Sequence, residues 1–201
     1  MSSQLKIDID QPLFREAVRS LAYHEAGHYI IARLVGFKTG NISVVAQNID
    51  GHIDGSSGVM LQKKIRNEND ILKYLGDRVQ VLLAGAFSET LSSNKVDEDA
   101  TVKILEEGGA KQDLAKIIEL LHLIRNIRYP DTKSDEEAQS TLDSIKDELW
   151  GKTKKLVERE SESICGLGDR IASEIKKVGD RVILKADEIN ALLPIKTRFP
   201  L

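Results

Sequence analysis

Hydrophobic positions recur at helical spacing along most of the chain. Apolar residues that return every three or four positions lie on one face of an α-helix and can be buried together. Gly36 ends the first such segment, and Ser134 with Glu137 forms a capping box at the start of the longest. The segments with this spacing are about residues 12–35, 70–87, 100–107, 111–127, 134–162, 171–178 and 187–193.

Short extended segments complete the pattern. Residues 41–45 and 59–62 are typical of strands, a glycine-containing polar loop separates them, and a third extended piece is expected at 181–184. Gly166 and Gly168 predict a break between helices near the C-terminus. The pattern therefore predicts a mainly α fold of the α+β type, with a small β-sheet beside the first helices and a helical C-terminal bundle.

The composition is that of an ordinary globular chain. Of the 201 residues, 41% are hydrophobic and 30% are charged, and the formal net charge is -3. Lysine and arginine are interleaved with aspartate and glutamate, which argues against a nucleic-acid partner. The single cysteine, Cys165, excludes an intrachain disulfide, and the N-terminus lacks the pattern of a signal peptide. No apolar run approaches the roughly 20 residues that span a bilayer, so we expect a cytoplasmic protein without a membrane span.

One motif carries clear chemistry: residues 24–28 read His-Glu-Ala-Gly-His, inside the first predicted helix. Four residues make just over one helical turn, so His24 and His28 lie on one face and their imidazoles can bind one ion. Two imidazoles suit a catalytic zinc, which also needs a third protein ligand and a water. Glu25 then lies where a general base is needed. A chance pair of histidines on a half-buried face is the alternative, and the motif together with the segments below favours the metal site.

Three further residues have structural interpretations. Gly27 lies inside a helix, where glycine costs about 1 kcal/mol relative to alanine, so we expect another backbone to pass close to it. His52 lies in the polar loop and is interpreted as a surface residue. His122 lies among leucines and an isoleucine and is expected to pack in the core.

Further short motifs follow the histidine motif in a set order. They are Ser57-Gly58-Val59-Met60, Leu83-Ala84-Gly85 with Glu89, Gly108-Gly109-Ala110 with Asp113-Leu114, and the terminal stretch 183–193. Together with HEAGH, they resemble the protease domain of the FtsH-type ATP-dependent zinc metallopeptidases over about residues 12–195. The resemblance implies a single peptidase-like domain over residues 1–201, with a metal-site half at about 12–130 and a helical half at about 131–195.

The resemblance implies a role for each matching residue. His24 and His28 would be zinc ligands and Glu25 the catalytic base, in agreement with the interpretation of the motif. Asp113 would be the third ligand. The residues alone leave a rival open, because many zincins use a downstream glutamate on a helix and Glu89 fits that description. With Asp113 as the ligand, Glu89 is expected to orient a ligand imidazole from outside the coordination shell.

The resemblance also implies a substrate-binding strand. Gly58, Val59, Met60 and Leu61 are similar to the family's strand beside the cleft. In zincin proteases such an edge strand lets an extended peptide pair through backbone hydrogen bonds. These residues are therefore expected to align the substrate.

The chain departs from the family at several points. No Gly-x-x-x-x-Gly-Lys-Ser/Thr phosphate loop occurs in it, and no membrane segment. Tyr29 stands where the family usually has a small residue, and Gln112 where it usually has asparagine. The start Met1-Ser2-Ser3 favours a stand-alone protein over a fragment.

These observations lead to one expected function and two alternatives. We expect an ATP-independent zinc metallopeptidase that cuts unfolded or flexible polypeptides. Besides its polypeptide substrate, the partners that fit this function are further copies of the chain, in a homo-oligomer, or a separate unfoldase. The first alternative is a catalytically inactive zinc-binding module that docks on a partner in an interaction or regulatory role. The second is a helical scaffold without zinc, which requires the histidine motif to be accidental.

Overall fold

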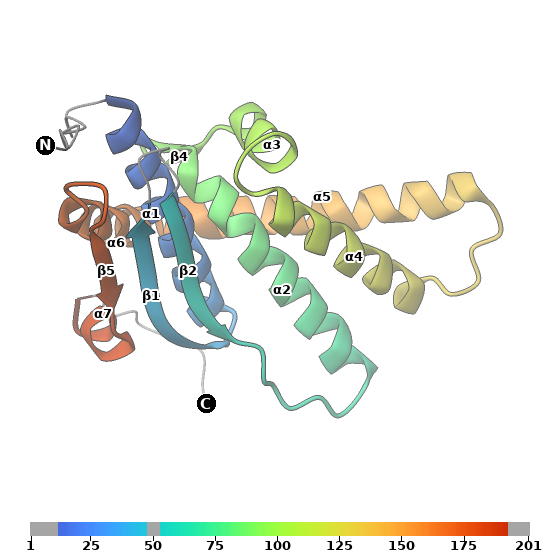
Figure 1. Ribbon diagram of the computed structural model, residues 1–201. Helices are drawn as coiled ribbons and strands as arrows, with labels where there is room; N and C mark the ends of the chain where they lie inside the picture. Colours follow the sequence, from blue (N-terminus) through green and yellow to red (C-terminus); the bar gives the residue numbers. More distant parts are fainter. Residues whose placement is uncertain (1–11, 48–52, 193–201) are drawn as a thin grey trace, which may run out of the picture.

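The computed structural model describes residues 12–47 and 53–192 (Figure 1). The predicted fold class is confirmed there, because the chain is mainly helical with a three-stranded antiparallel sheet. In these ranges no helix combines the length and the hydrophobicity that a membrane crossing requires. The helices are α1 (Pro12–Leu34), α2 (Glu68–Glu89), α3 (Glu98–Glu106), α4 (Lys111–Arg128), α5 (Asp135–Arg159), α6 (Ser161–Glu174) and α7 (Ala186–Leu192). The strands are β1 (Lys38–Ala46), β2 (Ile53–Met60), β3 (Leu91–Ser92), β4 (Lys95–Val96) and β5 (Arg181–Leu184).

Helix α1 is the central element of the fold. It packs against β1, β2, α2 and α6, and the two strands lie in front of it in Figure 1. Its second half is completely buried at Tyr29, Ile30 and Ile31. The helix ends at Leu34, and Gly36 follows with a positive φ of 86°, a conformation that glycine adopts at low cost. The predicted stop at Gly36 is confirmed.

The sheet has the strand order β2-β1-β5, so among the described residues β2 is an edge strand. β2 pairs with β1 from Ile53 opposite Ala46 to Met60 opposite Lys38. The predicted strand at 59–62 is therefore wrong in position, because most of the supposed loop before it is strand. Glycine and serine carry no hydrophobic signal, although every second residue of β2 is half-buried.

Helices α1 and α2 approach each other very closely at Gly27. A Cβ on Gly27 would lie 2.5 Å from the carbonyl oxygen of Ala84 and 2.8 Å from Cβ of Ser88, both on α2. The predicted close passage of another backbone is confirmed, and it explains a glycine in a helix interior. This contact sets the histidine motif directly against the second half of α2.

A buried ion pair holds the segment that follows β2. Lys63 donates to Asp77 of α2 at 2.8 Å and to the backbone oxygen of Val35, just after α1, at 2.8 Å. Asp77 is only 5% exposed and also accepts from Lys73 at 2.8 Å, so its buried charge has two partners. The chain leaving the edge strand is thereby tied to both α1 and α2.

The C-terminal half contains two long helices separated by one residue. Helix α6 continues through Gly166 and Gly168, so the predicted break at these glycines is wrong. Gly168 is required for packing instead, because a Cβ there would lie 2.5 Å from Cδ1 of Tyr23 on α1. Nothing lies within 4 Å of a Cβ on Gly166. Packing against Tyr23 therefore requires glycine at position 168, whereas no neighbouring atom requires it at position 166.

This contrast provides a test of the packing of α6. We expect Gly166→Ala to raise the free energy of unfolding by up to about 1 kcal/mol, because alanine is the better helix former at an open position. Gly168→Ala should lower it by about 1–3 kcal/mol, because the added methyl group overlaps the Tyr23 ring. Urea denaturation followed by circular dichroism measures both changes. Equal effects of the two substitutions would contradict the packing of α6 on α1.

Candidate metal centre

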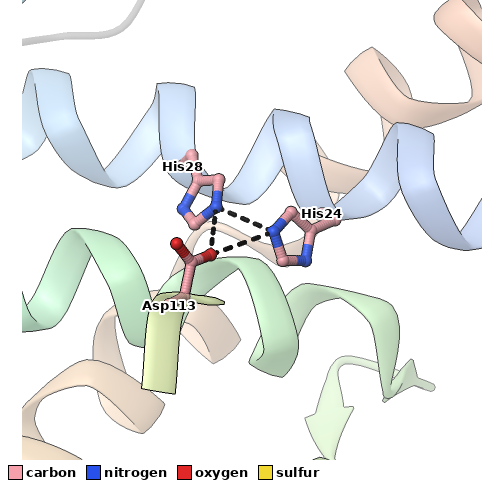
Figure 2. A group of neighbouring side chains, drawn as sticks. All are labelled: His24, His28 and Asp113. Atoms are coloured by element: carbon pink, nitrogen blue, oxygen red, sulfur yellow. Dashed lines mark hydrogen bonds and ion pairs between the residues drawn. The ribbon is translucent and has the colours of Figure 1, made fainter. Parts of the chain in front are cut away.

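His24 and His28 lie on the same face of α1, one turn apart (Figure 2). Their Nε2 atoms are 2.8 Å apart, and their rings meet edge to face with centroids 4.4 Å apart. His24 is 9% exposed, so the pair lies in a largely desolvated position. Helical spacing alone thus brings both imidazoles to one point.

Asp113 reaches the same point from a distant part of the chain. It lies in the first turn of α4, and its Oδ2 is 3.3 Å from Nε2 of His24 and 3.1 Å from Nε2 of His28. Helix α4 packs beside α2, and its N-cap residue, Ala110, is buried and provides no side-chain cap. The carboxylate of Asp113 therefore faces the two histidines instead of capping its own helix.

The three side chains fit a metal ion. Within the described ranges, His24, His28 and Asp113 form a group whose ligand atoms all lie within 4.8 Å of one another. Ligands bound about 2.0–2.1 Å from a tetrahedral zinc stand about 3.3 Å apart, close to the 2.8–3.3 Å between these atoms. Two imidazole nitrogens and one carboxylate oxygen are also ligands that zinc accepts. The cluster can therefore hold a metal ion after small side-chain movements.

The outer nitrogen of each ring, Nδ1, lies away from the cluster and has a hydrogen-bond partner of its own. Nδ1 of His24 is 2.7 Å from Oε1 of Glu89, whose other oxygen accepts a hydrogen bond from Ser20. Nδ1 of His28 donates to the backbone oxygen of Val81 on α2 at 2.7 Å. Such contacts orient histidine ligands in metal sites, because they leave Nε2 free to face the ion. Glu89 thus contacts the outer nitrogen of His24, whereas Asp113 faces both Nε2 atoms.

Gly85 makes room for the two rings. A Cβ on Gly85 would lie 2.6 Å from Cε1 of His24 and 2.7 Å from Cε1 of His28. Helix α2 can therefore pass directly over the histidine pair only with glycine at this position. The same passage brings Val81 and Glu89 of α2 within hydrogen-bond distance of the rings.

The cluster attracts positive charge. Burial favours the neutral imidazole of His24, but hydrogen bonds to Asp113 and Glu89 outweigh burial and raise its pKa to about 10. Burial also favours the neutral acid of Asp113, but His24 and His28 hold the pKa of this carboxyl well below its usual range. A positive charge among these residues is therefore stabilised, and a metal ion can supply it in place of protons.

Glu25 lies beside the pair and contacts the edge strand. It is 5% exposed. Ser57 of β2 donates to Oε2 of Glu25 at 2.6 Å, and the same hydroxyl is 2.7 Å from the backbone oxygen of Glu25. A Cβ on Gly55 would lie 2.7 Å from Oε1 of Glu25, so glycine leaves space for the carboxylate. No spacing in the sequence points to the Ser57 contact, because β2 is far from the motif along the chain.

A cleft of about 720 Å³ opens over these residues. Of the four residues expected beside the substrate, Val59 and Leu61 line the cleft, whereas Gly58 and Met60 are not part of its lining. Gly58 packs against Asn41 of β1, and Met60 is 48% exposed. Residues of the cleft include His24, Glu25, His28, Glu89, Asp113 and residues 53–57 of β2.

Three other residues that the sequence singles out, two histidines and the cysteine, add nothing to the metal centre in the part of the chain that the structure describes. His52 lies outside the described residues. His122 is exposed, so the expectation that it packs in the core is wrong. The buried face of α4 is carried by Leu121 and Ile124, and position 122 falls outside that stripe. Cys165 is half-buried, and burial raises the pKa of its thiol, which disfavours the reactive thiolate.

No protein-family model matches the chain, and a search of curated proteins finds no match to it. The metal centre therefore rests on the geometry of the side chains described above. The resemblance to the FtsH-type peptidases rests on the ordered motifs of the sequence.

The geometry distinguishes Asp113 from Glu89 as a ligand. We expect Asp113→Asn to weaken zinc binding by more than about 100-fold, because a charged ligand is lost. Glu89→Gln should weaken it by about 10- to 100-fold, because Glu89 only orients His24. Competition with a chelating dye measures both affinities. A greater loss in Glu89→Gln than in Asp113→Asn would reverse the assignment.

Proposed function

We propose that the chain is a zinc metallopeptidase that hydrolyses peptide bonds in unfolded or flexible polypeptides without ATP. The observation that carries this proposal is the meeting of His24, His28 and Asp113 beside the carboxylate of Glu25 in one open cleft. The order of motifs shared with the FtsH-type peptidases supports the same reaction.

In this proposal His24, His28 and Asp113 hold the zinc ion. When bound, zinc supplies a Lewis acid for the scissile carbonyl and lowers the pKa of a water. Glu25 accepts a proton from the attacking water and delivers it to the leaving amine as the peptide bond breaks. One carboxylate thus acts first as a general base and then as a general acid.

Three contacts hold these groups in position. The hydroxyl of Ser57 donates to the Glu25 carboxylate, which restricts its rotation. Glu89 and the backbone oxygen of Val81 each hold the outer nitrogen of one imidazole. Preorganised side chains of this kind avoid the cost of ordering them during the reaction.

The edge strand β2 offers a template for an extended peptide. Residues on both of its faces line the cleft, with Asp54 and Ser56 on one and Gly55 and Ser57 on the other. An edge of this kind can hold a peptide through backbone hydrogen bonds, which do not depend on the side chains of the peptide. Only an extended segment can pair in this way, so the proposed substrates are unfolded chains, flexible tails and short peptides.

The role of Glu25 gives a direct test. We expect Glu25→Gln to lower kcat for an unstructured polypeptide by about 10²- to 10⁴-fold, because glutamine cannot accept the proton. Zinc content should be unchanged. The matched control is Glu16→Gln, an exposed residue of the same helix, which should keep full activity. Cleavage that survives in Glu25→Gln would remove Glu25 from this role, and zinc binding without any cleavage by the unaltered chain would favour the inactive module.

A further inference from the structure

Arg78 lines the cleft from α2. It lies one helical turn before Val81, whose backbone oxygen accepts the hydrogen bond from His28. The residue is half-buried, and burial lowers its pKa, yet a guanidinium stays charged at any ordinary pH. Tyr74 and then Asp113 act against this lowering of the pKa, and Asp113 lines the same cleft as Arg78.

The other charged groups that line the cleft already have partners. The pairs are Asp113 with His24, His28 and Lys116, Glu89 with His24 and Ser20, Glu25 with Ser57, and Asp54 with Gln47. No hydrogen bond or ion pair joins Arg78 to the part of the chain that the structure describes. Within that part, Arg78 is the one charged residue of the cleft lining without a hydrogen bond or ion pair.

A partly desolvated charge without a partner is costly, and an anion in the cleft would relieve that cost. The planar guanidinium matches a carboxylate particularly well, because two parallel N–H groups can donate to its two oxygens. We infer that Arg78 binds a carboxylate of the substrate, so that peptides carrying one near the scissile bond are preferred. This inference rests on the proposed peptidase function. The carboxylate can belong to the C-terminus of the peptide or to an acidic side chain.

The test measures binding separately from cleavage. It uses three labelled, unstructured peptides of matched sequence: one with a free C-terminus and no acidic side chain, one amidated with a single internal glutamate, and one amidated and neutral. Fluorescence anisotropy measures their affinity for the zinc-loaded Glu25→Gln chain. We expect one or both carboxylate peptides to bind about 10- to 100-fold more tightly than the neutral peptide, the range of a charge-assisted pair. The carboxylate peptide that binds more tightly than the neutral one identifies the source of the carboxylate.

Variants at position 78, made in the same Glu25→Gln background, assign the preference. Arg78→Gln should abolish it and leave the affinity for the neutral peptide unchanged, while Arg78→Lys should keep part of it. Arg181→Gln is the matched control, because Arg181 is exposed on β5 at the other edge of the sheet from β2. Thermal unfolding and zinc content check that each variant is folded. Equal binding of all three peptides, or an equal loss for all of them in Arg78→Gln, would overturn the inference.

Turnover separates this inference from the proposed function. If the chain with Glu25 intact cleaves all three peptides and Arg78→Gln lowers kcat/KM equally for each, the carboxylate site is wrong and the peptidase stands. If the chain binds carboxylate peptides through Arg78 but cuts none of them, the peptidase is wrong and the carboxylate site stands.

Discussion

The close crossing of α1 and α2 is the constraint on which the rest of the structure depends. Gly27 on α1 and Gly85 on α2 remove the two Cβ atoms that would otherwise hold the helices apart. At this distance one carbonyl and one carboxylate of α2 reach the outer nitrogens of the two imidazoles. Helix α4 packs on α2, so the crossing also determines where Asp113 lies. A wider crossing would move the carbonyl of Val81, the carboxylate of Glu89 and the carboxylate of Asp113 away from the two histidines.

Charge compensation explains how the polar residues of the metal centre can be largely buried against the hydrophobic core. His24 has a carboxylate on each side, with Glu89 at Nδ1 and Asp113 near Nε2. Buried charges are tolerated when each has a partner, and the loss of one partner leaves the other costly. The same compensation makes the cluster suited to a cation, since acidic and neutral ligands surround a central position. Arg78 differs from these groups because no hydrogen bond or ion pair joins it to the described residues.

The sequence allowed some parts of this arrangement to be predicted and obscured others. The pairing of His24 with His28 needs only helical periodicity, and the packing role of Gly27 follows from the cost of glycine in a helix. The sequence does not reveal the start of strand β2, because its residues 55–58, Gly-Ser-Ser-Gly, carry no hydrophobic signal. The glycines of α6 predict a break, because composition cannot distinguish a glycine that ends a helix from Gly168, which makes room for Tyr23.

By itself, the sequence determined local features of this protein: that most of the chain is helical, which residues of the first helix share a face, and that two imidazoles and Glu25 stand within about one turn. Only the tertiary structure decided which distant groups meet them. It brought Asp113 to the Nε2 atoms and Glu89 to an Nδ1 atom, and it set Ser57 and Arg78 in the same cleft. The physical reason is that periodicity acts over a few residues, whereas the meeting of two faces depends on how the whole chain packs.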